Sequence, residues 1–278
     1  MSARSYLYVP GDQPEKLAKA AGRGADALIV DLEDAVAPEN KELARRTVRD
    51  WLGSRGADGP PVWVRVNSGP TMSDDLSAIA GLGSDGVMVP KASRASVEQV
   101  RELSVIALIE TAAGLVDAVG IASCPGVVRL AIGEADLAVE LGVEPSPGEP
   151  EFAYHRAQVV LASAAAGLDA PIAPVSTDFR DLDALRASTL ELRRMGFGAR
   201  SAIHPAQVQP IHEAFTPSPD ELARARRLVE LFHAAGGGVC VDDEGRMVDE
   251  PVVRAARRLI GRSSPGVEEE GGAGTGSS

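Results

Sequence analysis

Short apolar runs alternate with helix-like segments over about the first 215 residues, and this alternation restricts the possible folds more than any other feature of the chain. Eight runs have the length and composition of buried parallel strands. In chain order they are SYLYV, DALIVDL, PVWVRVN, GVMVPK, VIALIE, VVRLAIGE, APIAPV and GARSAIHP. Eight strand–helix repeats predict an α/β protein built as a closed (β/α)8 TIM barrel. An open doubly wound sheet is the alternative, but no glycine-rich dinucleotide fingerprint follows the first run.

The chain after residue 216 has a different pattern. Pro217 and Pro219 precede one more helix-like segment, and VCVDDEGRMVDEPVV is typical of a short hairpin followed by a helix. A piece of this size buries little core by itself, so we expect it to pack on the barrel or on a neighbouring subunit. The predicted organisation is a catalytic barrel at residues 1–216, a small helical and hairpin extension at 217–262, and a disordered, acidic, Gly- and Ser-rich tail at 263–278.

Composition excludes two classes of partner. Asp and Glu number 40 against 28 Lys and Arg, and the resulting net charge of -12 argues against nucleic acid. No apolar run approaches the ~20 residues of a membrane-spanning helix. The run YLYV near the start is too short for the apolar core of a signal peptide. We therefore expect a soluble, cytoplasmic protein that binds neither nucleic acid nor membrane.

Charged and polar residues stand where the predicted strands end. In a barrel the carboxyl ends of all strands open on one mouth, which is where catalytic groups are found. The residues at these ends are Asp31, Glu33 and Asp34, then Arg65 and Asn67, then Lys91, Glu110, Glu134, Asp136 and His204.

The stretch from Val105 to Leu141 contains two of the runs, each followed by an acid, with TAAGLVDAVGIA between them as one predicted helix. A right-handed crossover would bring both strand ends, and so Glu110 and Asp136, to the same side of the sheet. Two carboxylates with positions left for water and substrate oxygens suit Mg2+, with Mn2+ as a possible substitute. The alternative is that both are ordinary acids near helix N-termini, where negative charge is stabilising.

Four neighbouring residues each allow two interpretations. Glu33 and Asp34 are either acceptors for metal-bound water or acids that cap the following helix. Arg65 lies in an apolar strand, and its buried guanidinium requires an anion, either a substrate carboxylate or Glu33. Lys91 is either a ligand-binding residue or a solvated loop lysine.

The order of the motifs resembles one known family. The motifs are VPGDQPEKLAKA, DLEDAVAPENKELAR, VRVN, VMVPKA, ALIETAAGL, AIGEADLAVELG, GFGARSAIHPAQV and GRMVDEPVVRAA. Together they are similar to the HpcH/HpaI aldolase and citrate lyase beta-subunit family, and within it to the citrate-lyase-beta-like CoA ester lyases. The resemblance spans roughly residues 5 to 262.

This resemblance implies a Mg2+-dependent (β/α)8 barrel that forms a homo-oligomer, either a trimer or a hexamer. Glu110 and Asp136 match the family's metal ligands, and Glu110 thereby also belongs to the substrate-binding group. Arg65 matches the arginine that binds the substrate carboxylate and stabilises the enolate. Glu33, expected as an acceptor for metal-bound water, is placed with the catalytic residues.

Other assignments rest wholly on the resemblance. Asp249 in GRMVDEP matches a catalytic acid that a C-terminal lid contributes to the site of a neighbouring subunit. Lys19 and Lys91 match basic positions that line the CoA site. Two departures from the family pattern are Ala135, where many relatives have an acid, and Ser176, where several relatives have Asp.

The function that the resemblance implies is cleavage or formation of a carbon–carbon bond next to a thioester. A CoA thioester of the malyl-, citramalyl- or citryl-CoA type would give a 2-oxo acid and an acyl-CoA by a retro-Claisen or retro-aldol reaction. Two alternatives remain. One is a metal-dependent aldolase that acts on free hydroxy and oxo acids without CoA. The other is a beta subunit that works only within a multi-subunit citrate lyase.

Overall fold

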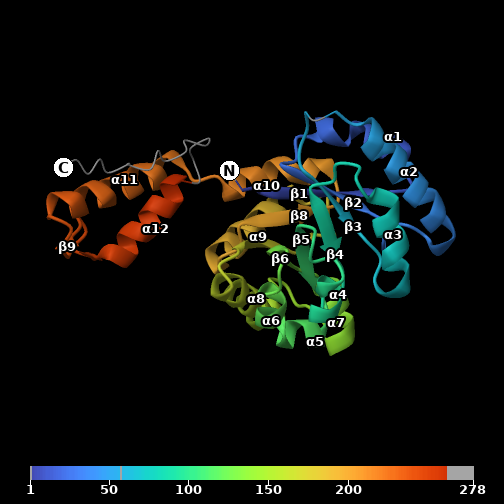
Figure 1. The fold of residues 1–278 in the computed structure, drawn as a ribbon. Coiled ribbons are helices and arrows are strands. Elements are labelled where there is room, and N and C mark those ends of the chain that lie inside the picture. The colour runs from blue at the N-terminus through green and yellow to red at the C-terminus, as the bar shows by residue number, and fades with distance from the viewer. Residues whose placement is uncertain (1, 57, 262–278) are drawn as a thin grey trace, which may run out of the picture. The chain divides into compact units, whose positions relative to one another are not determined.

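The computed structural model describes residues 2–56 and 58–261, so the tail predicted at 263–278 lies outside the described residues. Eight parallel strands form a closed barrel in chain order, and β8 pairs with β1. The helices of residues 2–215 surround the barrel (Figure 1). The prediction of a (β/α)8 barrel is therefore confirmed. The strands are β1 (Ser5–Pro10), β2 (Ala27–Asp31), β3 (Val62–Arg65), β4 (Gly86–Val89), β5 (Val105–Ile109), β6 (Val127–Ile132), β7 (Asp169–Ala173) and β8 (Ala199–Ala202).

Helices or short helical turns connect each strand to the next. The α-helices are α1 (Pro14–Ala20), α2 (Lys41–Ser54), α3 (Met72–Ile79), α4 (Arg94–Glu98), α5 (Ala112–Val116), α6 (Ala118–Ala122), α7 (Glu134–Leu141), α8 (Ala153–Ala165), α9 (Leu182–Met195) and α10 (Val208–Phe215). Single 3-10 turns are η1 (Ala21–Arg23), η2 (Pro38–Asn40), η3 (Gly69–Thr71), η4 (Pro150–Phe152) and η5 (Pro205–Gln207).

Alternation along each strand divides the core into two layers. In β5 the side chains of Ile106 and Leu108 belong to the small cluster that fills the barrel. Val105, Ala107 and Ile109 belong to the larger cluster between the barrel and its helices. Because successive strand residues face opposite sides, the next inward position after Leu108 is residue 110. The same period brings residue 31 of β2 and residue 65 of β3 to the inner face.

One predicted helix was wrong. The segment expected as one helix after β5 forms α5 and α6, separated at Asp117, whose backbone (φ -99°, ψ 17°) leaves the helical region. Aspartate has a low propensity for the interior of a helix. The carboxylate of Asp117 instead accepts two hydrogen bonds of 2.6 and 2.7 Å from Arg94 of α4. Helix α7 begins at Glu134, so Asp136 lies inside its first turn.

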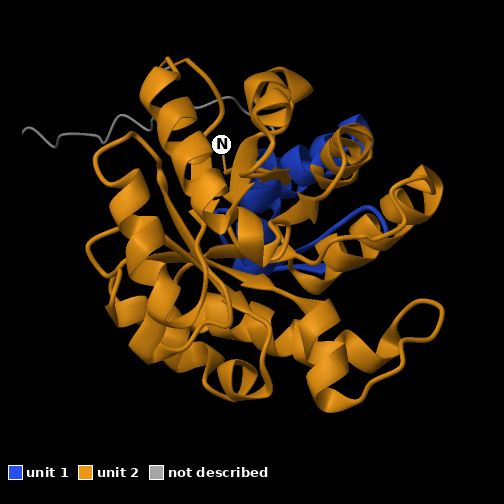
Figure 2. Cartoon of the chain, turned by 90° about the vertical axis from the view of Figure 1, so that its right-hand side faces the viewer, with its two compact units in different colours: residues 1, 216–278 blue, residues 2–215 orange. Residues whose placement is uncertain are grey.

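The chain divides into two compact units after Phe215 (Figure 2). The second unit contains α11 (Pro219–Ala234), an antiparallel pair of short strands β9 (Cys240–Val241) and β10 (Met247–Val248), and α12 (Glu250–Gly261). Its small core consists of Phe232, Val248 and Val253. Among the residues that the structure describes, no helix combines the length and the apolar character needed to cross a bilayer.

Candidate active site

A buried ion pair between Asp31 and Arg65 forms the base of the site. The two residues are partners in the register of β2 and β3. Nε of Arg65 donates to Oδ1 of Asp31 over 2.8 Å, and Nη2 donates to Oδ2 over 2.5 Å. The guanidinium carbon lies 5.1 Å from the ring centre of Tyr8. Burial opposes the charge on Arg65, but the hydrogen bonds and the charge of Asp31 raise the pKa of Arg65 above its usual value.

The sequence left open whether Arg65 pairs with Glu33 or binds a ligand. Asp31, which is fully buried, is its bidentate partner. Nη1 of Arg65 also lies 2.8 Å from Oε2 of Glu33, an oxygen with no aligned hydrogen-bond donor. Asp34 is more distant, at 3.7 Å from Nη1, and its side chain is largely exposed. Arg65 is thus held in place on one side and faces acids on the other.

Lys91 connects Glu33 with the acids that follow β5 and β6. Its Nζ lies 2.8 Å from Oε1 of Glu33, 3.8 Å from Oε1 of Glu110 and 3.8 Å from Oδ2 of Asp136. Its backbone N–H donates to Oε1 of Glu110 over 2.8 Å. Burial raises the pKa of Glu33, although the charges of Arg65 and Lys91 oppose this effect. The structure therefore brings Glu33, Lys91, Glu110 and Asp136 together at one mouth of the barrel.

Of the two acids predicted to bind the metal, Glu110 is more buried than Asp136. Only 3% of its surface is exposed, whereas 45% of the Asp136 side chain is accessible. Burial raises the pKa of Glu110 to about 8, and the neighbouring charges of Glu33 and Asp136 add to the increase. Gly133 packs directly against it, because a Cβ at that position would lie 2.6 Å from Oε2 of Glu110. A glycine is therefore needed where β6 ends.

The charge and donor set of this mouth fit a divalent cation. Four carboxylates, those of Asp31, Glu33, Glu110 and Asp136, face the two cations Arg65 and Lys91. When all four carboxylates are ionised, they exceed the two cations by two charges, which is the charge of one divalent cation. Within the described ranges no group of three or more Asp, Glu, His or Cys side chains is arranged to hold a metal by itself. Two carboxylates completed by water and substrate oxygens are the arrangement that Mg2+ commonly accepts.

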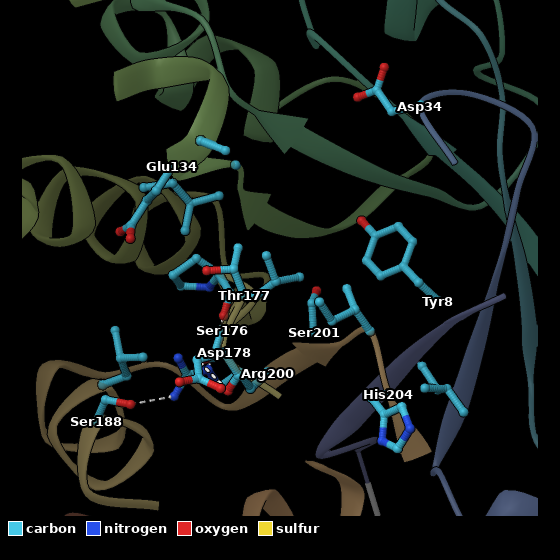
Figure 3. Close-up of a pocket in the computed structure, with 18 of the residues that line it drawn as sticks. Tyr8, Asp34, Glu134, Ser176, Thr177, Asp178, Ser188, Arg200, Ser201 and His204 are labelled. Carbon is cyan, nitrogen blue, oxygen red and sulfur yellow. Dashed lines mark hydrogen bonds between the residues drawn. The ribbon is translucent and has the colours of Figure 1, made fainter. Parts of the chain in front are cut away.

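A cavity of about 1400 Å3 is lined by Asp31, Arg65, Glu110 and Asp136 of this group. Figure 3 shows part of its lining, with Tyr8 and Asp34 on one side and the loop after β7 on the other. Lys19, predicted to line a CoA site, is exposed on α1 and lines this cavity. Further lining residues include Lys16, Arg23, Arg65, Glu110, Gly133, Asp136, Pro147, Arg156, Thr177, Arg200 and His204.

The sequence did not identify a second buried ionic cluster in the cavity wall. Arg156 of α8 donates to both carboxylate oxygens of Glu134 over 2.6 and 2.7 Å, and it also binds Glu149. Glu134 thus faces Arg156 and is not part of the acid group around Lys91. Arg200 of β8 donates to the hydroxyl of Ser188 (Figure 3). It also donates to Pro174 O and to the hydroxyl of Thr189. The sequence signal that could have identified Arg200 is an arginine inside a short predicted strand, the same signal that identified Arg65.

Two other candidates have structural roles in the described residues. Nδ1 of His204 accepts from the backbone N–H of Ala206, and its ring stacks on Phe179 at 4.9 Å. Asp249 lies in the second compact unit, where its carboxylate accepts from the N–H of Val252 at the start of α12. The catalytic role expected for Asp249 remains a proposal.

Comparison with known proteins gives consistent matches. A family model described as HpcH/HpaI aldolase/citrate lyase matches residues 4–205. A (3S)-malyl-CoA thioesterase of Cereibacter sphaeroides is 37% identical over 270 residues, which is 94% of either chain. A citrate lyase subunit beta-like protein of Mycobacterium tuberculosis is 36% identical and covers 95% of this chain and 97% of its own.

A solved structure is similar over nearly the whole length. It is the CitE protein of Mycobacterium tuberculosis in complex with magnesium, acetoacetate and coenzyme A. The TM-score is 0.84 at 32% identity, and the match covers 94% of this chain and 98% of that one.

Proposed function

Because the chain belongs to the HpcH/HpaI aldolase/citrate lyase family, and is thus a lyase, we propose that it cleaves a carbon–carbon bond in the CoA thioester of a 2-hydroxy acid. The substrate is of the malyl-, citramalyl- or citryl-CoA type, and the products are a 2-oxo acid and an acyl-CoA. The observation that carries the proposal is the convergence of Glu110 and Asp136 on Lys91, which Glu33 connects to the fixed guanidinium of Arg65.

Magnesium is the proposed cofactor, and Mn2+ is a possible substitute. The similar protein solved in complex with magnesium supports the choice of cofactor. Glu110 and Asp136 would hold it, because both carboxylates lie 3.8 Å from one point, the ammonium of Lys91. When bound, the ion supplies Lewis-acid polarisation of the carboxylate and hydroxyl oxygens of the 2-hydroxy acid. Glu110 fits this role in shape as well as in charge, because Lys91 N–H and Gly133 fix its carboxylate on two sides.

Arg65 stabilises the charge that develops when the carbon–carbon bond breaks. The electron pair of that bond moves onto the carbon next to the thioester and is delocalised onto the thioester carbonyl oxygen, which forms an enolate. A guanidinium already oriented by Asp31 stabilises such a charge without reorganising in the reaction. Glu33, whose pKa is raised by burial, is assigned to accept the proton of the substrate hydroxyl. The enolate carbon then needs a proton donor.

Asp249 is the proposed proton donor, contributed by the C-terminal lid of a neighbouring subunit in a homotrimer. This assignment rests on the resemblance of GRMVDEP to the corresponding family motif. Mixing Arg65→Ala subunits with Asp249→Asn subunits should restore part of the activity, since some sites then receive both intact residues. Lack of any recovery in verified mixed oligomers would argue against the shared site.

In this proposal residues 1–216 are the catalytic domain and residues 217–262 are the lid. The proposed location is the cytoplasm, where CoA thioesters are metabolised.

The substrate is tested by incubating the purified chain and Mg2+ with malyl-, citramalyl- and citryl-CoA. We expect one of them to give a 2-oxo acid, trapped as its phenylhydrazone, with no added acyl-carrier partner. Turnover by the chain alone would exclude the role of an obligate citrate lyase subunit. Turnover of the free hydroxy acid at an equal rate would favour the aldolase alternative, in which CoA is not needed.

A thioesterase is the second candidate function, because one of the similar proteins is a (3S)-malyl-CoA thioesterase. The two reactions differ in the bond that is cleaved. A lyase leaves the thioester intact in the acyl-CoA product, whereas a thioesterase releases free CoA thiol and no 2-oxo acid. A thiol reagent added to the same reaction therefore distinguishes them.

A further inference from the structure

Lys91 contacts the acids of the barrel mouth through both its backbone and its side chain. The backbone N–H holds Oε1 of Glu110 over 2.8 Å. The ammonium nitrogen is 2.8 Å from Glu33 and 3.8 Å from both Glu110 and Asp136. Both proposed metal ligands are thus equally far from one positive charge. The side chain of Lys91 is 39% exposed, so its head group borders on solvent.

The backbone of Lys91 is also unusual. Its φ of 47° lies in the left-handed region, which residues other than glycine seldom adopt. Such a conformation persists only where the surroundings fix it, and the hydrogen bond to the buried Glu110 does so here. The turn after β4 is therefore built around the contact between residue 91 and Glu110.

We propose that Lys91 is the resident counter-charge of the Glu110–Asp136 pair and that it limits the affinity of this pair for a divalent cation by competing for the same carboxylates. The inference rests on the proposed metal role of these two acids. A magnesium ion lies about 2.1 Å from its carboxylate ligands. It would strongly repel an ammonium held 3.8 Å from the same two oxygens.

The two cations of the mouth differ in their freedom to respond. Arg65 is fixed by its bidentate bonds to Asp31 and has only 10% of its side chain exposed. Lys91 has a flexible four-carbon stem that lets its head move towards solvent. Lys91 is thus the cation that moves when a metal binds. The free energy needed to move its ammonium group reduces the affinity of the site for the metal.

The test compares Mg2+ affinity, measured by isothermal titration calorimetry, with the melting temperature in EDTA. Lys91→Met removes the charge and keeps most of the stem. We expect it to bind Mg2+ at least tenfold more tightly, about 1.4 kcal/mol, and to melt at a lower temperature in EDTA. Lys91→Gln, which retains a donor for Glu33, should show the same two effects if the methionine variant folds poorly.

Two controls separate charge from structure. Lys91→Arg keeps the charge and should stay within about threefold of the original affinity. Lys16→Met removes a lysine of α1 that lines the cavity shared with Glu110 and Asp136, and it should change the affinity by less than about threefold. If Lys91 only positioned Glu110 and Glu33, its neutral variants would bind Mg2+ more weakly, which is the opposite sign.

The inference is overturned if the neutral variants bind Mg2+ with equal or lower affinity, or if Lys91→Arg tightens binding as much as they do. If the original protein takes up no Mg2+ in the same titration, the proposed metal site itself is wrong, and the inference fails with it. The two failures are therefore distinguishable.

Discussion

Replacing Glu110 by Gln tests the proposed metal site with the least change of shape. The amide oxygen can still accept the hydrogen bond from Lys91 N–H, and the packing against Gly133 is kept. Burial raises the pKa of Glu110 to about 8, so without metal its carboxyl is mostly protonated at neutral pH. Replacing it by a neutral amide should therefore not lower the free energy of unfolding. We therefore expect the variant to melt in EDTA at or above the temperature of the original protein.

The variant should also lose the rise in melting temperature that Mg2+ gives the original protein. At a concentration of 100 Kd a ligand stabilises the folded state by about 2.7 kcal/mol. For a protein of this size each kcal/mol corresponds to about 2–4 °C, so the original protein should gain about 5–11 °C. Loss of outer partners of a metal weakens binding by about 10–100-fold, and loss of a direct ligand by at least about 100-fold. The same Mg2+ concentration then equals Kd and adds only about 0.4 kcal/mol, or about 1 °C.

The assay is a thermal melt with and without Mg2+. The control variant is Glu98→Gln, which neutralises an exposed acid of α4 and should keep the full increment. If Glu110→Gln retains an increment of about 5 °C or more, Glu110 is not a ligand and the reasoning from burial and charge is wrong.

Three further predictions follow from the same structure. Gly133→Ala should destabilise the protein by about 1–3 kcal/mol in urea and weaken Mg2+ binding, because its Cβ would lie 2.6 Å from Glu110, whereas Gly53→Ala has open space and should not destabilise. Asp31→Asn should cost about 3–5 kcal/mol, since it removes the charge that the buried Arg65 binds with two hydrogen bonds; a cost below about 1 kcal/mol would contradict this. Burial lowers the pKa of His212, so folding stability should fall as pH drops below its ordinary value of 6.5, and His212→Gln should flatten that part of the pH profile; an unchanged slope would refute it.

The barrel could be predicted because its signal is local and repeated. Each strand is a short apolar run, and the inward period of two carries Glu110 and Arg65 to the mouth without further information. The order of motifs also identified the family, which the family model and the relatives confirm. Helix ends were less predictable, since the break at Asp117 depends on a tertiary partner, Arg94.

Pairing among charges could not be derived from the sequence. Several acids follow β2, and only the register of β2 with β3 makes Asp31, rather than Glu33, the bidentate partner of Arg65. In the same way, Glu134 was grouped with the mouth acids, but Arg156 on a later helix binds it. Such choices are set by distances across the fold that no sequence spacing encodes.

The central claim is that this chain breaks a carbon–carbon bond and that Glu110 and Asp136 hold the metal for that step. The most direct measurement quantifies acyl-CoA, 2-oxo acid and free CoA thiol in one reaction by mass spectrometry. We predict equal amounts of acyl-CoA and 2-oxo acid with no free thiol, and loss of both products in EDTA and in Glu110→Gln. Free thiol without a 2-oxo acid, or undiminished turnover in EDTA, would contradict the account.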